Sequence, residues 1–349
     1  MPITIISQGT LQTLYEFQTQ VAQITGMDVA NASMYDGSTA CGEAALMARR
    51  VTKKKKVILS GNLHPQYIQV VKSATRYTDD DVIVNDPAVD ATESLIDQVD
   101  DDTSCVIVQY PDFFGNIHDY SALADALHER KKLLVVVTTE IVALGAIKSP
   151  GEMGADIVVG EGQSIGNGLC YGGPYAGLFA TRQKYVRQLP GRLCGETTDA
   201  DGKRGYVLTL STREQHIRRE KATSNICTNA GLCTLAFTIH MTLLGEKGYR
   251  QLAKVNHASA VKLKNKLADM DGLEVLNKTF FNEFTVRLNK NAADVVEALV
   301  ERDVIAGLPV SRLYPKNTAL ENDLLIAVTE TTSDDDMDIL VEELKEVLK

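Results

Sequence analysis

Two spacings of apolar residues alternate along the first half of the chain. Short, uniformly apolar runs indicate strands that are buried on both faces, and they lie at 57–60, 82–85, 105–110, 133–138, 156–160 and 176–181. Apolar residues at helical spacing between these runs predict helices over 42–51, 66–77, 91–99 and 120–130. The alternation predicts an α/β fold with a mostly parallel central sheet, which would bind ligands beyond the carboxyl ends of its strands.

The pattern changes in the last third of the chain. A long helix is predicted around 228–245, and its apolar segment 230–244 is expected to be buried. Helix, strand, strand, helix, strand and helix follow at 252–270, 273–276, 283–288, 292–302, 324–329 and 336–348. This order is typical of a small α+β domain, so we expect a large α/β domain over 1–247 and a smaller domain over 248–349.

Length, charge and cysteine content narrow the class of protein. The chain has 349 residues, which is enough for two domains with a sizeable core. Its net charge of −10 disfavours a nucleic-acid-binding protein, and the one dense basic run, 53–56, is interpreted as a solvated turn. Six scattered cysteines without a Cys-x-x-Cys pair favour a reduced, cytoplasmic protein over a disulfide framework or a metal site. Segment 230–244 is too short to cross a membrane.

A candidate anion site lies where the first helix after a strand-like run begins. Gly37 allows a close approach to free N–H groups, and hydroxyls follow at Ser38 and Thr39. The alternative is a plainly capped helix in which Asp36 or Ser38 caps its own backbone. His64 ends a strand, where its flat ring could stack on a cofactor or be merely structural.

The glycine-rich segment 160–168 differs from a dinucleotide-binding loop. Its third glycine is one position late, and no early strand-loop-helix unit surrounds it. Gly172, Gly173 and Pro174 extend the loop, and so much glycine implies that the backbone passes close to a ligand or to another chain. The chain contains no His-Glu-x-x-His, Gly-x-Ser-x-Gly or P-loop motif.

A second candidate anion site precedes the long helix. The cationic side chains there are those of Arg213, Arg218, Arg219 and Lys221. Hydroxyl and amide side chains follow at Thr223, Ser224, Asn225 and Thr228. Together they could hold a phosphate at a helix start. The alternatives are a basic surface turn and, for Thr228, a simple helix cap.

Several of these segments together resemble one known family across essentially the whole chain. They are Ser-Gln-Gly-Thr-Leu-Gln at 7–12, Ala-Ser-Met-Tyr-Asp-Gly at 32–37, Gly-Ala-Asp-Ile-Val-Val-Gly-Glu-Gly-Gln at 154–163, Gly-Gly-Pro at 172–174 and Arg-Arg-Glu-Lys-Ala-Thr-Ser-Asn-Ile-Cys-Thr at 218–228. They look like the glycine cleavage system P-protein, and more narrowly its subunit 1, the α chain of the two-subunit form. The resemblance implies the fold type I, aspartate-aminotransferase-like architecture of pyridoxal-phosphate enzymes.

The chain departs from the family pattern in two respects. Family α chains carry a substantial segment before the Ser-Gln-Gly-Thr-Leu-Gln motif, which here begins at Ser7, so we expect a truncated chain. A fold type I enzyme places its Schiff-base lysine where this chain has Ser164, and no lysine occurs between Lys148 and Lys184. Glu140 stands where an aspartate would pair with the pyridinium nitrogen. A hydroxyl cannot replace the amine that forms the Schiff base.

The resemblance therefore implies a non-cofactor-bearing subunit of a glycine-decarboxylating dehydrogenase. Its β-chain partner would hold pyridoxal phosphate and decarboxylate glycine, and the aminomethyl group would pass to the lipoyl arm of H-protein. We expect an α2β2 assembly, or self-association of the chain alone. The alternatives are a purely structural or regulatory subunit and a self-sufficient enzyme that uses Lys148 or Lys221. The residues expected to approach the partner's site are Thr223, Ser224, Asn225 and Thr228, and those expected to mark a vestigial pocket are Gly37, Ser38, Thr39 and His64.

Overall fold

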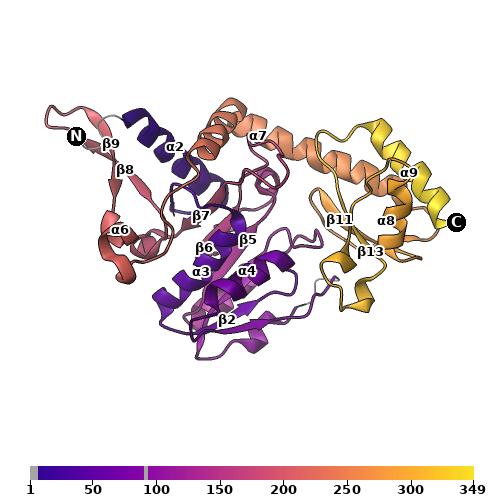
Figure 1. Cartoon of the computed structure of the whole chain (residues 1–349), viewed down its shortest axis with the longest axis horizontal. Helices are drawn as coiled ribbons and strands as arrows, with labels where there is room; N and C mark the ends of the chain where they lie inside the picture. Colours follow the sequence, from indigo (N-terminus) through magenta and orange to yellow (C-terminus); the bar gives the residue numbers. More distant parts are fainter. Residues whose placement is uncertain (1–6, 90–92) are drawn as a thin grey trace. The chain divides into compact units, whose positions relative to one another are not determined.

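The computed structural model describes residues 7–89 and 93–349, which form two compact units. The first unit contains the described residues of Met1–Asp86, Ser94–Tyr110 and Asp119–Tyr249, and the second contains those of Pro87–Glu93, Pro111–His118 and Arg250–Lys349 (Figure 1). The second unit thus takes two short segments from the first half of the chain, which the expected boundary at 247/248 did not include.

The first unit is built on a seven-stranded sheet in the order β1-β7-β6-β5-β4-β2-β3. The neighbours from β3 to β6 run parallel, whereas β7 is antiparallel to both β6 and β1. The prediction of a mostly parallel sheet is confirmed. The six strands predicted for this sheet are all present, and its seventh, the two-residue strand β1, was not predicted. The strands are β1 (Val29–Ala30), β2 (Lys56–Leu59), β3 (Asp81–Val84), β4 (Thr103–Gln109), β5 (Leu133–Thr138), β6 (Ile157–Glu161) and β7 (Gly177–Thr181).

Helices α3 (Gly37–Thr52), α4 (Pro65–Thr75) and α5 (Ser121–Glu129) match three of the predicted helices. The fourth, over 91–99, is wrong where the structure describes it: Ala91 and Thr92 lie outside the described residues, and the remainder contains only the 3-10 helix η1 (Leu95–Gln98). Only Leu95 is buried in η1, so there is no apolar face on which a longer helix could pack. Helix α2 (Gln8–Thr25) was not predicted.

A hairpin of β8 (Leu193–Thr198) and β9 (Arg204–Thr209) precedes a short irregular segment that contains α6 (Gln215–Arg218). Helix α7 (Gly231–Leu267) follows and is bent at Gly245, whose φ of 59° and ψ of −177° are not helical. It therefore combines the two helices predicted on either side of residue 245. The described part of the chain has no helix that is both long and apolar enough to cross a membrane.

The expected burial of segment 230–244 is wrong for one face of α7. Phe237 and Met241 are buried, but Leu232, Ile239 and Leu243 are exposed. The helix also begins at Gly231 and not at Thr228. The segment is apolar, as the sequence analysis recognised, but the assumption that this chain buries all of it is wrong.

The second unit has the predicted α+β character. Its four-stranded antiparallel sheet has the order β10-β11-β13-β12 and buries Phe284, Leu324 and Ile326. Ser333 and Asp336 form a reciprocal capping box that begins helix α9, which confirms the expected helix start. The elements of this unit are the C-terminal part of α7, β10 (Leu273–Val275), β11 (Glu283–Leu288), α8 (Ala292–Val300), β12 (Leu308–Pro309), β13 (Asp323–Ala327) and α9 (Asp334–Leu348).

Candidate functional site

His64, one of the residues that the sequence analysis placed in a vestigial pocket, lies beyond the carboxyl end of strand β2. His64 begins helix α4, where its Nδ1 accepts a hydrogen bond from the backbone N–H of Gln66 at 3.2 Å. Its own backbone N–H donates to the Gln109 side chain at 2.8 Å, and Gln109 donates in turn to the Thr139 hydroxyl at 3.1 Å. Burial lowers the pKa of His64, so the ring is neutral at physiological pH. His64 is therefore a helix-capping residue in this pocket.

The start of helix α3 is capped by its own carboxylate, as in the alternative interpretation of this segment. The Asp36 carboxylate accepts a hydrogen bond from the backbone N–H of Thr39 at 2.8 Å and further hydrogen bonds from the hydroxyls of Ser38 and Thr39. Burial alone would raise the pKa of Asp36, but these hydrogen bonds outweigh it and hold the pKa below its usual value. The two hydroxyls expected to bind an anion are thus turned towards Asp36.

A second carboxylate accepts the first N–H group of this helix, that of Gly37. Glu161, the last residue of β6, accepts a hydrogen bond from the backbone N–H of Gly37 at 3.0 Å through Oε2. Its Oε1 accepts from the backbone N–H groups of Gln163 at 3.0 Å and Ala176 at 2.8 Å. A Cβ atom on Gly37 would lie 2.3 Å from the Tyr67 hydroxyl oxygen, so only glycine fits here. The sequence analysis missed Glu161, although it lies in one of the family segments.

Ser164 and Glu140 lie together at the ends of β5 and β6. The Ser164 hydroxyl donates to Glu140 Oε1 at 3.1 Å, and the same carboxylate oxygen accepts from the backbone N–H of Val142 at 2.9 Å. Lys148 donates to the Ser121 hydroxyl at 3.0 Å, and Lys221 is exposed on a separate segment. The residues present do not fit covalently attached pyridoxal phosphate, because residue 164 has no amine. At the start of α3, carboxylates already accept the N–H groups of Gly37 and Thr39.

Segment 223–230 is anchored on the residues that precede helix α3. The backbone N–H of Cys227 donates to the Tyr35 hydroxyl at 2.9 Å, and that of Ala230 donates to the Ser33 hydroxyl at 2.9 Å. Two family segments almost 200 residues apart thus form one surface. Tyr35 was noticed in the sequence only as a member of its motif, and nothing there indicated this role.

The side chains of segment 223–230 differ in burial. Ile226 is buried and Ser224 is half-buried, and the Ser224 hydroxyl bonds the backbone N–H of Ile226 at 3.0 Å. Burial raises the pKa of the neighbouring Glu43, and a hydrogen bond from Ser224 opposes that rise. Asn225 and Thr228 are exposed. Of the residues expected to approach a partner, Ser224 therefore faces inward, whereas Asn225 and Thr228 are accessible.

The basic residues before this segment do not converge on one site. Arg213 donates to the backbone carbonyls of Leu189, Leu210 and Gly191, which fixes the chain where it leaves the hairpin. Arg218 and Arg219 are exposed. The helix α7 begins at Gly231, three residues after Thr228, so Thr228 is not its cap.

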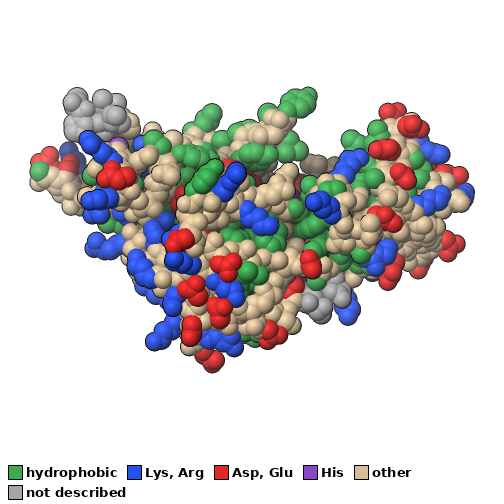
Figure 2. Space-filling view, turned by 60° about the horizontal axis from the view of Figure 1, so that its bottom comes forward, with side chains coloured by type: hydrophobic (Ala, Val, Ile, Leu, Met, Phe, Trp, Pro, Cys, Tyr) green, Lys and Arg blue, Asp and Glu red, His purple; other side chains and the backbone are tan. Residues whose placement is uncertain are grey.

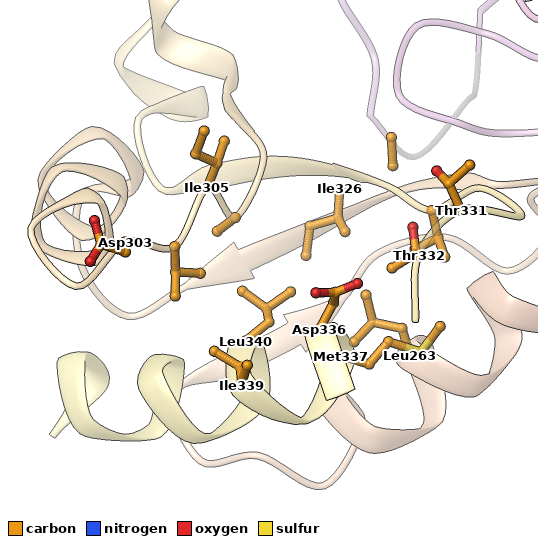
Figure 3. Close-up of a pocket in the computed structure, with 14 residues that line it drawn as sticks. Leu263, Asp303, Ile305, Ile326, Thr331, Thr332, Asp336, Met337, Ile339 and Leu340 are labelled. Carbon is orange, nitrogen blue, oxygen red and sulfur yellow. The ribbon is translucent and has the colours of Figure 1, made fainter. Parts of the chain in front are cut away.

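A pocket of about 390 Å³ opens in the second unit (Figure 3). Apolar side chains, among them those of Leu263, Ile326 and Leu340, form most of its lining. Of its two carboxylates, that of Asp336 is committed to the Ser333 cap. The other polar side chains of the described lining are those of Thr331 and Thr332, and no histidine, cysteine or lysine lies beside them to activate a hydroxyl, so this pocket is not the candidate catalytic site.

Comparison with known proteins is decisive for the family. The model of the glycine cleavage system P-protein matches residues 4–344. The chain belongs to the glycine cleavage system P-protein family. It is 63% identical over 344 residues to the probable glycine dehydrogenase (decarboxylating) subunit 1 of Parvibaculum lavamentivorans, covering 98% of this chain and 77% of that protein. It is 64% identical over 339 residues to the corresponding protein of Beijerinckia indica, covering 97% and 76%.

Solved structures agree with this assignment. An inhibitor-bound glycine decarboxylase (P-protein) of the glycine cleavage system superimposes with a TM-score of 0.93 at 40% identity, over 99% of this chain and 78% of that one. A sphingosine-1-phosphate lyase from Burkholderia pseudomallei and a glutamate decarboxylase from Lactobacillus brevis give TM-scores of 0.72 and 0.73 at 15% identity, which shows the shared fold alone. The expected fold type I architecture is confirmed.

The Asp36 cap predicts a pH-dependent contribution to stability. Because the folded-state pKa of Asp36 lies below the unfolded value near 3.8, its contribution is present above that value and is lost as the pH falls through the folded pKa. Asp36→Ala should lower the free energy of unfolding at pH 7 by about 0.5–2 kcal/mol. The difference from wild type should shrink below about pH 4 in denaturant titrations. Asp36→Asn keeps a capping group without the charge, so the cap at residue 36 should contribute equally to its stability at pH 7 and below about pH 4. If the loss of unfolding free energy in Asp36→Ala were the same at both pH values, the interpretation would be contradicted.

Proposed function

We propose that the chain is subunit 1 of a glycine dehydrogenase (decarboxylating), and that it is the subunit that does not carry the cofactor. Its membership of the P-protein family supports a role in glycine decarboxylation. The serine at position 164, where a lysine would be needed, supports the role of the subunit without the cofactor. The relatives from Parvibaculum lavamentivorans and Beijerinckia indica bear the name of subunit 1. In this proposal the β chain decarboxylates glycine and transfers the aminomethyl group to lipoylated H-protein, in the cytoplasm.

The proposal assigns pyridoxal phosphate to the β chain. Covalent attachment of this cofactor requires a lysine amine, and Ser164 offers only a hydroxyl that is already bonded to Glu140. Phosphate binding requires free donors at a helix start, and those of α3 are bonded to Asp36 and Glu161. Both requirements therefore fail in the pocket of this chain.

Borohydride reduction tests this assignment directly. When the purified chain is incubated with pyridoxal phosphate and reduced, mass analysis should find no stoichiometric pyridoxyl adduct on any lysine. The same treatment of the complex with the β chain should label that chain. A stoichiometric adduct on Lys148 or Lys221 would support a self-sufficient enzyme and contradict the proposal.

An exposed apolar stripe on α7 supports the proposed association with the β chain. Leu232, Leu235, Ile239 and Leu243 recur at intervals of three and four residues and therefore share one face of the helix. Their exposed fractions are 81%, 38%, 51% and 83%. Figure 2 shows hydrophobic side chains gathered along the upper edge of the molecule in that view. A contiguous apolar patch of this kind is typical of a protein–protein interface, and an α2β2 assembly would cover it.

Charges placed on the stripe should weaken the complex. We expect Ile239→Asp combined with Leu243→Asp to lower the affinity for the β chain at least tenfold, because each carboxylate would have to be desolvated at the interface. Sedimentation velocity of the mixed subunits measures the loss. Ile305→Asp with Ile339→Asp is a matched control, since these side chains are 87% and 49% exposed in the second unit. Equal loss in both double variants would exclude a specific role for the stripe.

The exposed residues of segment 223–230 distinguish a subunit that contributes to the reaction from a scaffold. If Thr228 donates a hydrogen bond to a charged group at the partner's site, Thr228→Ala should lower glycine decarboxylation by the complex about tenfold or more. The melting temperature and the assembly should not change, because Thr228 does not cap α7. Thr197→Ala, at another exposed hydroxyl of the first unit, is the control. Full activity of Thr228→Ala and Asn225→Ala would favour the purely structural or regulatory role.

A further inference from the structure

The Glu161 carboxylate makes contacts that the absence of a Schiff-base lysine at residue 164 does not explain. Glu161 is the last residue of β6, at the beginning of the glycine-rich loop, and its carboxylate accepts a hydrogen bond from the first residue of helix α3. We infer that the Glu161 carboxylate is a built-in anion, which occupies the start of α3 and keeps phosphate groups out of this pocket. The inference rests on the proposed function, in which the partner holds the cofactor. It adds a second reason, besides the missing lysine, why this chain would not hold the cofactor itself.

The geometry around Glu161 is that of a complete anion site. Three backbone N–H groups from three separate segments donate to its two oxygens: Gly37 at 3.0 Å, Gln163 at 3.0 Å and Ala176 at 2.8 Å. Gly37 is the first residue of helix α3, and Gln163 and Ala176 lie in the loop between β6 and β7. Backbone N–H groups that converge from helix starts and loops are donors with which proteins bind phosphate. Here the ligand is a side chain of the same polypeptide, held at high effective concentration by its position in β6.

Neighbouring groups would oppose an external phosphate as well. The Asp36 carboxylate lies at the same helix start, and its negative charge contributes to a raised pKa of Glu161, of which burial is the main cause. Asp36 also holds the hydroxyls of Ser38 and Thr39. The Tyr67 hydroxyl lies against Gly37. A phosphate would therefore meet two carboxylates and no uncommitted hydroxyl from Ser38 or Thr39.

Glu161 also closes the glycine-rich loop. Gln163 and Ala176 stand at the two ends of segment 164–175, and one carboxylate oxygen bonds both of their N–H groups. A backbone bond from Gly162 to Ala176 at 2.9 Å reinforces the closure. Within the loop, Leu169 and Tyr171 are exposed. The carboxylate that fills the anion position thus also fixes a loop that presents apolar side chains.

Removing the carboxylate should open the anion position. We would titrate inorganic phosphate into the full chain and into Glu161→Ala, and follow the backbone amide resonances of Gly37, Gln163 and Ala176. The wild-type resonances should not move, whereas those of the variant should shift and saturate, and its melting temperature should rise with phosphate concentration. Glu152→Ala is the matched control, because the Glu152 carboxylate also accepts a backbone N–H, from Ser149, but at a different place.

Two results would overturn the inference: saturable phosphate shifts at these amides in the wild-type chain, or none in a folded Glu161→Ala variant. If Glu161→Ala does not fold, Glu161→Gln provides the second measurement. Its single carbonyl oxygen cannot replace both carboxylate oxygens, so hydrogen exchange at Gly37 or at Ala176 should accelerate about tenfold or more. Unchanged exchange at both would also overturn the inference. None of these measurements uses glycine or the β chain. A result that overturns this inference can therefore be distinguished from one that overturns the proposed function, which the borohydride experiment tests.

Discussion

The first N–H groups of helix α3 constrain the whole candidate site, because buried backbone donors must find acceptors. In this chain Asp36 bonds the N–H of Thr39, and Glu161 bonds that of Gly37. Glu161 comes from β6, so its bond joins the helix start to the carboxyl edge of the sheet. The same carboxylate then bonds Gln163 and Ala176, and the glycine-rich loop follows from that contact. The shape of the pocket is thus a consequence of how one helix start is satisfied.

The residues before α3 also support the surface on its other side. Ser33 and Tyr35 accept backbone hydrogen bonds from Ala230 and Cys227, and so hold segment 223–230 against the first unit. This anchoring leaves Asn225 and Thr228 exposed. The anchored segment therefore presents these two side chains to the outside, which is consistent with a subunit that acts at a surface it shares with another chain.

The sequence predicted the central sheet well, because strands buried on both faces are continuous apolar runs. It missed β1, β12 and the β8–β9 hairpin, whose short or partly exposed strands lack such runs. For the site, the absence of a lysine at position 164 was visible in the sequence. The contact of Glu161 with Gly37 was not, since it joins residues 124 positions apart through tertiary structure alone. The half-buried position of Ser224, whose hydroxyl accepts the backbone N–H of Ile226, likewise could not be predicted from the pattern of residues alone.

The exposed apolar face of α7 could not be predicted either, although its apolar composition was recognised. An apolar segment is predicted to be buried because water disfavours apolar surface, but the prediction does not say which chain covers it. Leu232, Ile239 and Leu243 are exposed here, whereas Phe237 on the opposite face is fully buried and packs edge-on against Phe17 at 5.2 Å. One face of the helix thus stabilises the first unit, and the other remains available to a partner. In this chain Glu161 satisfies the start of α3 from within, while apolar side chains on α7 and polar side chains on segment 223–230 are exposed at the surface.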